Sequence, residues 1–326
     1  MSGVEVSFNE NMKLNTTKDL FLSNNKNKET FIHMLGKHLV TAGCKVLYHD
    51  GDADLEICFQ CIDSAKVKPV ALIGDGTDLL VLLLYHAKET VHDIIFMPRK
   101  SSPKKVNLSV KSILKSLQTD LTENLLFIHA LTGCDTTSRL QGIGKGTALK
   151  RLSSSSELCK LGQKFMQSSA DPTEIIKAGE KAIMILYHVK GNNTLDSMRY
   201  TKFLDLVSTK LNQVEPSSLP PTSSSAKYHS MRVYLQVQQW KDPKCSLKPE
   251  HWGWRKSKGV YIPIASDLEP APQNLLKEIW SNCQGDCNNR ISTCRKYKRE
   301  CSVAYENCGD SACSNKEKIE ICEIPG

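Results

Sequence analysis

The chain has 326 residues, of which 40% are hydrophobic and 24% charged, and these values exclude a fully disordered chain and suggest two or three folding units. The formal net charge of +8 favours anionic partners. Residues 1–17 lack the apolar core of a secretion signal, and the longest apolar run, residues 79–85, is too short to cross a bilayer. We therefore expect an intracellular protein, with the nucleus favoured and no membrane partner.

The first half of the chain alternates between helix-type and strand-type patterns. Apolar spacing predicts helices at residues 29–42 and 53–65, and short strands at 45–48, 70–73 and 94–97, with the continuous apolar run 79–85 between the last two strands. Such alternation indicates an α/β fold with a parallel sheet flanked by helices, in which ligand-binding residues gather at the carboxyl ends of the strands.

The second half is predicted to be mostly helical, with no further strand before the tail. The expected helices are residues 109–117, 121–132, 174–188, 195–211 and 226–240. Ser- and Pro-rich residues at 153–156 and 216–225 are typical of linkers. The predicted organisation is an N-terminal segment (1–28), a core (29–152), a helical region (153–240), a linker with a Trp-Gly-Trp sequence (241–280) and a Cys-rich tail (281–326).

Acidic residues follow two of the predicted strands. Asp50, Asp52 and Asp54 come after the strand at 45–48, and Asp75 and Asp78 after the strand at 70–73. Carboxylates at neighbouring strand ends can converge on one pocket and are the ligands that Mg²⁺ and Mn²⁺ prefer. Taken singly, each of these residues also fits a solvated loop or a helix cap.

The order of the acidic groups resembles a known family. Asp52-Ala-Asp54, Ile73-Gly-Asp-Gly-Thr-Asp78, Gly133-Cys-Asp135 and Gly142-Ile-Gly-Lys-Gly146 follow one another as in the internal region of flap endonucleases of the PIN-like superfamily. The likeness spans residues 45–152. It implies a partial PIN-like sheet in which Asp52, Asp54, Asp78 and Asp135 hold Mg²⁺ or Mn²⁺ and hydrolyse DNA phosphodiesters. More widely, the chain resembles a group of animal proteins associated with mobile elements.

The chain departs from the family pattern at two places. The family has acid-x-acid ending at the position of Asp78, whereas here Gly76 takes the earlier place and Asp75 lies one residue off register. The family's first strand, with its early Asp, has no counterpart before Glu29. A catalytically inactive DNA-binding remnant of the nuclease is therefore an alternative, and a protein–protein scaffold built on the helices between residues 174 and 240 is another.

The Gly-rich sequence 142–146 has the composition of a helix-hairpin-helix turn. Glycines let a backbone approach a phosphate, and the helix that follows presents free N–H groups. The residues expected to bind nucleic acid are Gly142, Gly144, Lys145, Gly146, Lys150 and Arg151. Residues 99–160 hold eleven Lys and Arg against four Asp and Glu, which predicts salt-sensitive, structure-directed binding of DNA rather than sequence-specific reading. The alternative is a flexible loop. No apolar strand precedes the turn, and the Gly-Lys-Ser/Thr ending of a P-loop is missing.

Six cysteines crowd the tail, with basic residues between them. They are Cys283, Cys287, Cys294, Cys301, Cys308 and Cys313. Thiolates are suitable ligands for Zn²⁺, and the segment resembles a tesmin-type CXC domain, which implies zinc and DNA binding. Ser292 and Tyr305 stand where that family has ligand cysteines, so the zinc tail is a degenerate one, and disorder is its alternative.

The remaining cysteines and the tryptophans favour structural roles. Cys58 and Cys61 fall within a predicted helix, where they are expected to be buried. Cys134 could pair with a histidine such as His129, but nothing else in the sequence supports a cysteine hydrolase. Residues 252–254 are either a stacking platform for bases or, more commonly for such a sequence, an anchor for the linker.

Overall fold

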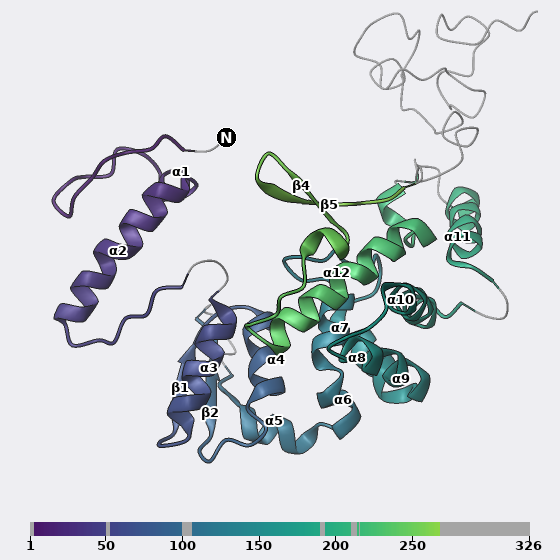
Figure 1. The fold of residues 1–326 in the computed structure, drawn as a ribbon, viewed down its shortest axis with the longest axis horizontal. Coiled ribbons are helices and arrows are strands. Elements are labelled where there is room, and N and C mark those ends of the chain that lie inside the picture. The colour runs from purple at the N-terminus through teal and green to yellow at the C-terminus, as the bar shows by residue number, and fades with distance from the viewer. Residues whose placement is uncertain are drawn as a thin grey trace, which may run out of the picture. The chain divides into compact units, whose positions relative to one another are not determined.

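The computed structural model describes residues 3–49, 53–99, 106–189, 193–209, 214 and 216–267 of a mixed α/β chain (Figure 1). It divides into two units, Met1–Glu56 and Ile57–Gly326. The boundaries expected at residues 28 and 152 lie inside these units. The predicted zinc tail, 281–326, lies outside the described residues.

The first unit consists of α1 (Lys18–Leu22) and α2 (Asn25–Thr41), with residues 3–17 beside them. Asn27 is buried and binds the preceding segment through both ends of its amide, donating to Val4 O at 2.8 Å and accepting from Val6 N at 2.8 Å. The predicted strand at 45–48 is wrong: these residues form no β-ladder, and the Tyr48 ring instead packs against His33 of α2, with 4.5 Å between the ring centroids.

The small sheet of the second unit has a parallel pair at its centre. Strand β1 (Val70–Ile73) pairs with β2 (Ile94–Met97), from Val70 opposite Ile94 to Ile73 opposite Met97, and the short β3 (Leu108–Ser109) adds antiparallel to β2. Helix α3 (Asp54–Ala65) precedes β1, and Cys58 and Cys61 on it are buried as expected. The apolar run 79–85 belongs to α4 (Thr77–His86), which connects the two parallel strands. Within the described residues this sheet has one parallel pair, and the PIN-like sheet that the resemblance implies is not shown.

Helices make up most of the rest of the second unit. They are α5 (Val110–Ser116), α6 (Thr119–Glu123), α7 (Leu125–Leu131), α8 (Lys145–Ser154), α9 (Ser156–Phe165), α10 (Pro172–Leu186), α11 (Leu195–Thr209) and α12 (Ser223–Lys241). The predicted helices at 109–117, 174–188, 195–211 and 226–240 are confirmed, with ends shifted by a few residues. The predicted helix at 121–132 is divided at Asn124, whose backbone (φ −100°, ψ 8°) interrupts the helix between α6 and α7.

Helix α12 lies against α7, α9 and α10 in the middle of the helical part (Figure 1). Eleven of its residues are buried, including the polar side chains of His229, Ser230 and Gln238. Every residue of α7 is buried as well. The core of the second unit therefore forms where α7 and α12 meet, and α10 covers α12 closely because it carries Gly179 opposite Ser230.

Two segments expected to be linkers carry regular structure. In the serine run 153–156, α8 ends at Ser154 and Ser155 caps α9, its side chain accepting a hydrogen bond from Leu158 N at 3.2 Å. The segment after α12 contains a hairpin of β4 (Trp254–Ser257) and β5 (Val260–Pro263), which corrects the expectation that no strand returns before the tail. For residues 153–156, composition alone could not distinguish a linker from a helix boundary, because serine is both a common linker residue and a favoured N-cap.

The Trp-Gly-Trp sequence anchors its segment onto the helical core. Trp252 is buried, and its ring lies 4.3 Å from that of Tyr234 on α12, centroid to centroid. The anchor interpretation of this sequence is confirmed. Among the described helices, none combines the length and the apolar character that are needed to cross a membrane.

Replacing Gly179 by alanine should destabilise the second unit. The added Cβ would overlap the Ser230 side chain, and extra atoms in a packed contact typically cost about 1–3 kcal/mol. We expect Gly179→Ala to unfold at a lower urea concentration than the wild type when unfolding is monitored by circular dichroism. Gly146→Ala is the matched control, since Gly146 is also helical but has open space around it, and this variant should be at least as stable as the wild type. Equal stability of Gly179→Ala and wild type would contradict the close packing of α10 on α12.

Candidate functional site

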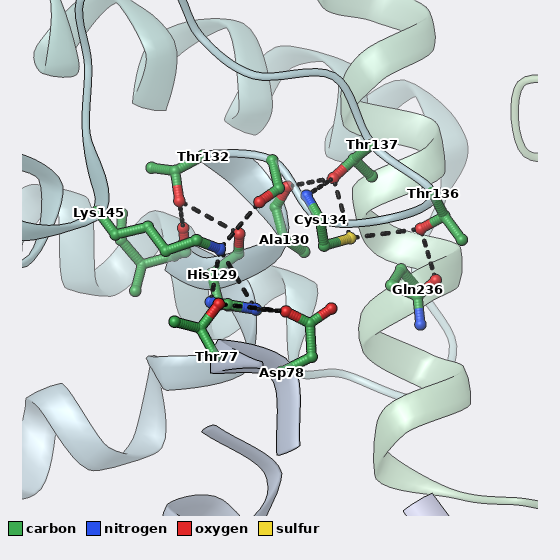
Figure 2. A network of polar contacts seen from close by, with 12 residues as sticks. Thr77, Asp78, His129, Ala130, Thr132, Cys134, Thr136, Thr137, Lys145 and Gln236 are labelled. Atoms are coloured by element: carbon green, nitrogen blue, oxygen red, sulfur yellow. Dashed lines mark hydrogen bonds and ion pairs between the residues drawn. The ribbon is translucent and has the colours of Figure 1, made fainter. Parts of the chain in front are cut away.

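Three side chains from separate helices meet at Asp78, which stands in the first turn of α4 (Figure 2). His129 Nε2 lies 2.8 Å from Asp78 Oδ1. Lys145 Nζ lies 2.8 Å from His129 Nδ1 and 3.2 Å from His129 Nε2, and it donates to Gly133 O at 2.9 Å. We call Asp78, His129 and Lys145 the acid–histidine–lysine cluster.

Each member of this cluster is held by the local backbone. Asp78 follows a turn at Gly76, which has a φ of +116°, a value that side-chain-bearing residues rarely adopt. His129 lies in α7 with only 3% of its side chain exposed. Lys145 is the first residue of α8, directly after the Gly-rich turn. The cluster therefore joins the end of the βα unit to the turn that was expected to bind phosphate.

The hydrogen bonds of the cluster determine where the protons lie. A carboxylate only accepts, so Nε2 of His129 carries the hydrogen that it donates to Asp78. Nδ1 is then free to accept from the Lys145 ammonium, which matches the shorter distance to that atom. The hydrogen bond from His129 and the nearby positive charge of Lys145 lower the pKa of Asp78, and burial lowers the pKa of Lys145.

The other acid at the end of β1 also has a cationic partner. Asp75 Oδ1 accepts a hydrogen bond from Arg99 N at 2.9 Å, and Asp75 Oδ2 lies 3.5 Å from Arg99 Nε. Arg99 follows the end of β2, so this pair joins the carboxyl ends of the two parallel strands, where the sequence placed a binding site. Within the described residues, both acids that follow β1 are thus compensated by side chains of the protein itself.

The predicted metal ligands are only partly placed. Asp52 lies outside the described residues; Asp54 is in the first turn of α3 and belongs to the first unit, whereas Asp78 and the exposed Asp135 belong to the second. Across the part of the chain that is described, three or more His, Cys, Asp or Glu side chains do not come together as a metal site would require. The structure brings Asp78 to His129 and Lys145, and the complete acidic set stays a prediction.

Cys134 does not form a nucleophile–base pair with His129. Its Sγ lies 3.4 Å from Thr136 Oγ1 and 3.1 Å from Thr137 Oγ1, and Thr136 Oγ1 in turn donates to Gln236 Oε1 of α12 at 2.5 Å (Figure 2). Thr137 Oγ1 also donates to Ala130 O at 2.7 Å. These contacts give Cys134 and its neighbours a structural role, in which they tie the loop after α7 to α12.

The Gly-rich turn is open to solvent at the start of α8. Gly142, Gly144 and Gly146 are exposed, and a Cβ at any of them would meet no atom within 4 Å. Gly144 is the N-cap of α8 and supplies no side-chain hydrogen bond to the helix. The turn therefore leaves room for a ligand beside backbone N–H groups, as the sequence suggested.

The basic residues predicted around the turn have different surroundings. Lys150 is exposed, whereas Arg151 is only partly exposed and its Nη1 is buried with no hydrogen-bond partner in the structure. Lys145 turns inward to His129 instead of outward. His129 itself was not expected to contact Asp78, since 51 residues separate them and no sequence pattern links them.

The six predicted zinc ligands, Cys283, Cys287, Cys294, Cys301, Cys308 and Cys313, lie outside the described residues. No protein-family model, curated protein or solved structure matches this chain. Its function must therefore be argued from the cluster, the Gly-rich turn and their surroundings.

Removing His129 should raise the pKa of Asp78 more than removing Lys145 does. The hydrogen bond from His129 lowers the pKa of Asp78 more than the charge of Lys145 does. We therefore expect the pKa of Asp78, measured by NMR titration, to be lowest in the wild type, higher in Lys145→Met and highest in His129→Leu. Because the folded-state pKa lies below the ordinary 3.8, the ionised carboxylate stabilises the fold above about pH 4, and this stabilisation is lost as the pH falls through the folded-state pKa. An Asp78 pKa unchanged in both variants would contradict the cluster.

Proposed function

We propose that the chain is a nucleic-acid-binding protein derived from a metal-dependent, structure-specific nuclease, and that it grips DNA phosphates at the Gly-rich turn. The observation that carries this proposal is the uncapped, open start of α8 at Gly144. A helix N-terminus carries a partial positive charge and unbonded N–H groups, which together favour a phosphate. Contacts of this kind hold the backbone of DNA and do not read its sequence.

The surrounding charges support the same function. Lys150 is exposed in the second turn of α8, and residues 99–160 carry most of the net positive charge of the chain. The predicted zinc tail would add a second basic, DNA-contacting element, and nuclear localisation would follow from such a function. A scaffold built on the helices from α10 to α12 is the less favoured alternative, because within the described residues α10 and α12 pack against each other and α12 is largely buried.

Hydrolysis of DNA is the second candidate, because Asp75 and Asp78 do follow β1 at the edge where ligands bind in parallel sheets. The residues in place do not favour it. Asp78 already binds His129 and lies beside the Lys145 ammonium. The positive charge of Lys145 would repel a divalent metal ion bound to Asp78. Gly76, where the family has an acid, has a backbone conformation that aspartate rarely adopts. The structure thus favours the binding protein over the nuclease.

Gly144→Asp should weaken DNA binding without weakening the fold. Gly144 has an ordinary extended backbone (φ −82°, ψ 160°) with open space for a side chain, so an aspartate can cap the N–H groups of α8 and should keep or raise the thermal midpoint. The same carboxylate repels phosphate. We expect about a tenfold loss of affinity for duplex and flap DNA in fluorescence anisotropy, and a shallower dependence of log Kd on log salt.

Gly144→Asn is the matched control, since it caps the helix without charge and should lose less affinity than Gly144→Asp. Wild-type affinity and salt dependence in Gly144→Asp would show that phosphate does not bind at the turn. Wild-type binding that is absent, or that does not respond to salt, would favour the scaffold instead.

The purified chain should not cleave labelled flap or single-stranded DNA in the presence of Mn²⁺ beyond the level of Asp78→Asn. Asp78 is engaged by His129, and the preceding acid of the family pattern is replaced by Gly76. Products would be followed on denaturing gels over a wide range of Mn²⁺ concentrations. Cleavage by the wild type that disappears in Asp78→Asn would overturn this expectation and establish the nuclease.

A further inference from the structure

A second positively charged site lies apart from the Gly-rich turn, in a cleft of about 500 Å³. Its walls come from the loop after α7, from α11, from the segment before α12, from α12 itself and from the residues after β5. Among the described residues, the lining includes Arg139, Arg199 and Arg232 together with five Ser and Thr side chains, and no Asp or Glu. Cavities that bind small ligands are usually between about 300 and 1,000 Å³.

Arg232 places an uncompensated charge inside this cleft. It is 5% exposed, and within the described residues no carboxylate lies within ion-pair distance of it. Its hydrogen bonds are to neutral acceptors, from Nη1 to Gly253 O at 3.3 Å and to Ile264 O at 2.7 Å. A guanidinium has five N–H donors, and a buried charge without a counter-ion is costly. An anion in the cleft would supply the missing partner.

The other two arginines add charge to the same lining. Arg199 donates to Pro220 O, and to Pro216 O at 3.2 Å, so it is held in place by the segment before α12. Burial lowers the pKa of Arg199, and the negative charge of Asp196, one helix turn earlier, offsets part of that effect, so Arg199 adds less uncompensated charge than Arg232 does. Arg139 is exposed and has no hydrogen bond or ion pair within the described residues.

His229, which also lines the cleft, adds no charge near neutral pH. Its Nε2 lies 2.9 Å from Leu131 O, to which it donates, and burial lowers the pKa of His229 to about 4. The positive field of the cleft therefore comes from the three guanidinium groups. Planar guanidinium forks bind phosphate oxygens in pairs, and hydroxyl groups can donate to the remaining oxygens.

We infer that this cleft binds a terminal phosphate group, carried either by a small ligand such as a nucleotide or by the end of a nucleic-acid strand. The site goes beyond the proposed function, since its lining contains none of residues 142–146 of the Gly-rich turn, although Leu140 and Gln141 directly precede that turn. Arg232 binds the anion at the buried end, and Arg139 meets it at the exposed end.

The test is isothermal titration of the full chain with inorganic pyrophosphate and with one oligonucleotide made with and without a 5′-phosphate. We expect saturable binding of pyrophosphate, weakened about tenfold or more in Arg139→Glu by the reversed charge. Arg139 is the residue to change because its guanidinium makes no hydrogen bond or ion pair within the described residues, whereas Arg232→Gln would also loosen the segment that follows β5. Arg255→Glu is the matched control, as Arg255 is exposed on β4 outside the cleft and should change the affinity less than about twofold.

Preference for the 5′-phosphorylated oligonucleotide over its unphosphorylated form, lost in Arg139→Glu, would identify a strand end as the ligand. Binding of pyrophosphate without that preference would identify a small phosphate ligand. Pyrophosphate binding that is lost in Gly144→Asp and kept in Arg139→Glu would place the phosphate at the Gly-rich turn and would overturn the inference. No saturable binding of any probe, or an equal loss in Arg139→Glu and Arg255→Glu, would overturn the inference.

Discussion

The hydrogen bonds that α12 makes to distant segments hold the second unit together. His229 donates to Leu131 O at the end of α7, Gln238 donates to Phe165 O at the end of α9, and Trp240 O lies 2.8 Å from His86 Nε2 at the end of α4. A buried polar group left without a partner costs about 1–3 kcal/mol, so each bond fixes the end of one helix against α12. The same hydrogen bonds position the two candidate sites, because α7 carries His129 and α12 carries Arg232.

The acid–histidine–lysine cluster determines how charge is distributed around the Gly-rich turn. Lys145 begins α8 but directs its ammonium toward His129 and Asp78. Its positive charge is therefore largely compensated by the Asp78 carboxylate. The positive potential outside the turn therefore comes from the helix N-terminus and from Lys150. The same arrangement is the reason that we propose binding rather than hydrolysis: Asp78, which a divalent cation would need, is hydrogen-bonded to His129 and lies beside the Lys145 ammonium.

Local periodicity was sufficient to predict β1, β2 and the helices from α10 to α12, because each has a continuous apolar pattern. It failed where a contact between distant segments decides the outcome. The strand expected at 45–48 has no strand to pair with among the described residues. In the hairpin each strand has only four residues, and β4 (Trp254–Ser257) is mostly polar. For the site, the positions of Asp78 and the open Gly-rich turn could be anticipated, whereas the partnership of Asp78 with His129 depends on how α4 packs against α7.

The position of α12 near the end of the described chain has a consequence for biosynthesis. The apolar residues of α7 are made about a hundred residues before the helix that covers them, and His86 is separated from its partner Trp240 by 154 residues. A nascent chain that has emerged only as far as α9 exposes that surface, which is the kind of region that chaperones recognise and that aggregates when left uncovered. The second unit can therefore complete its folding only after α12 has left the ribosome, and a premature stop before residue 223 would yield a chain unable to bury α7.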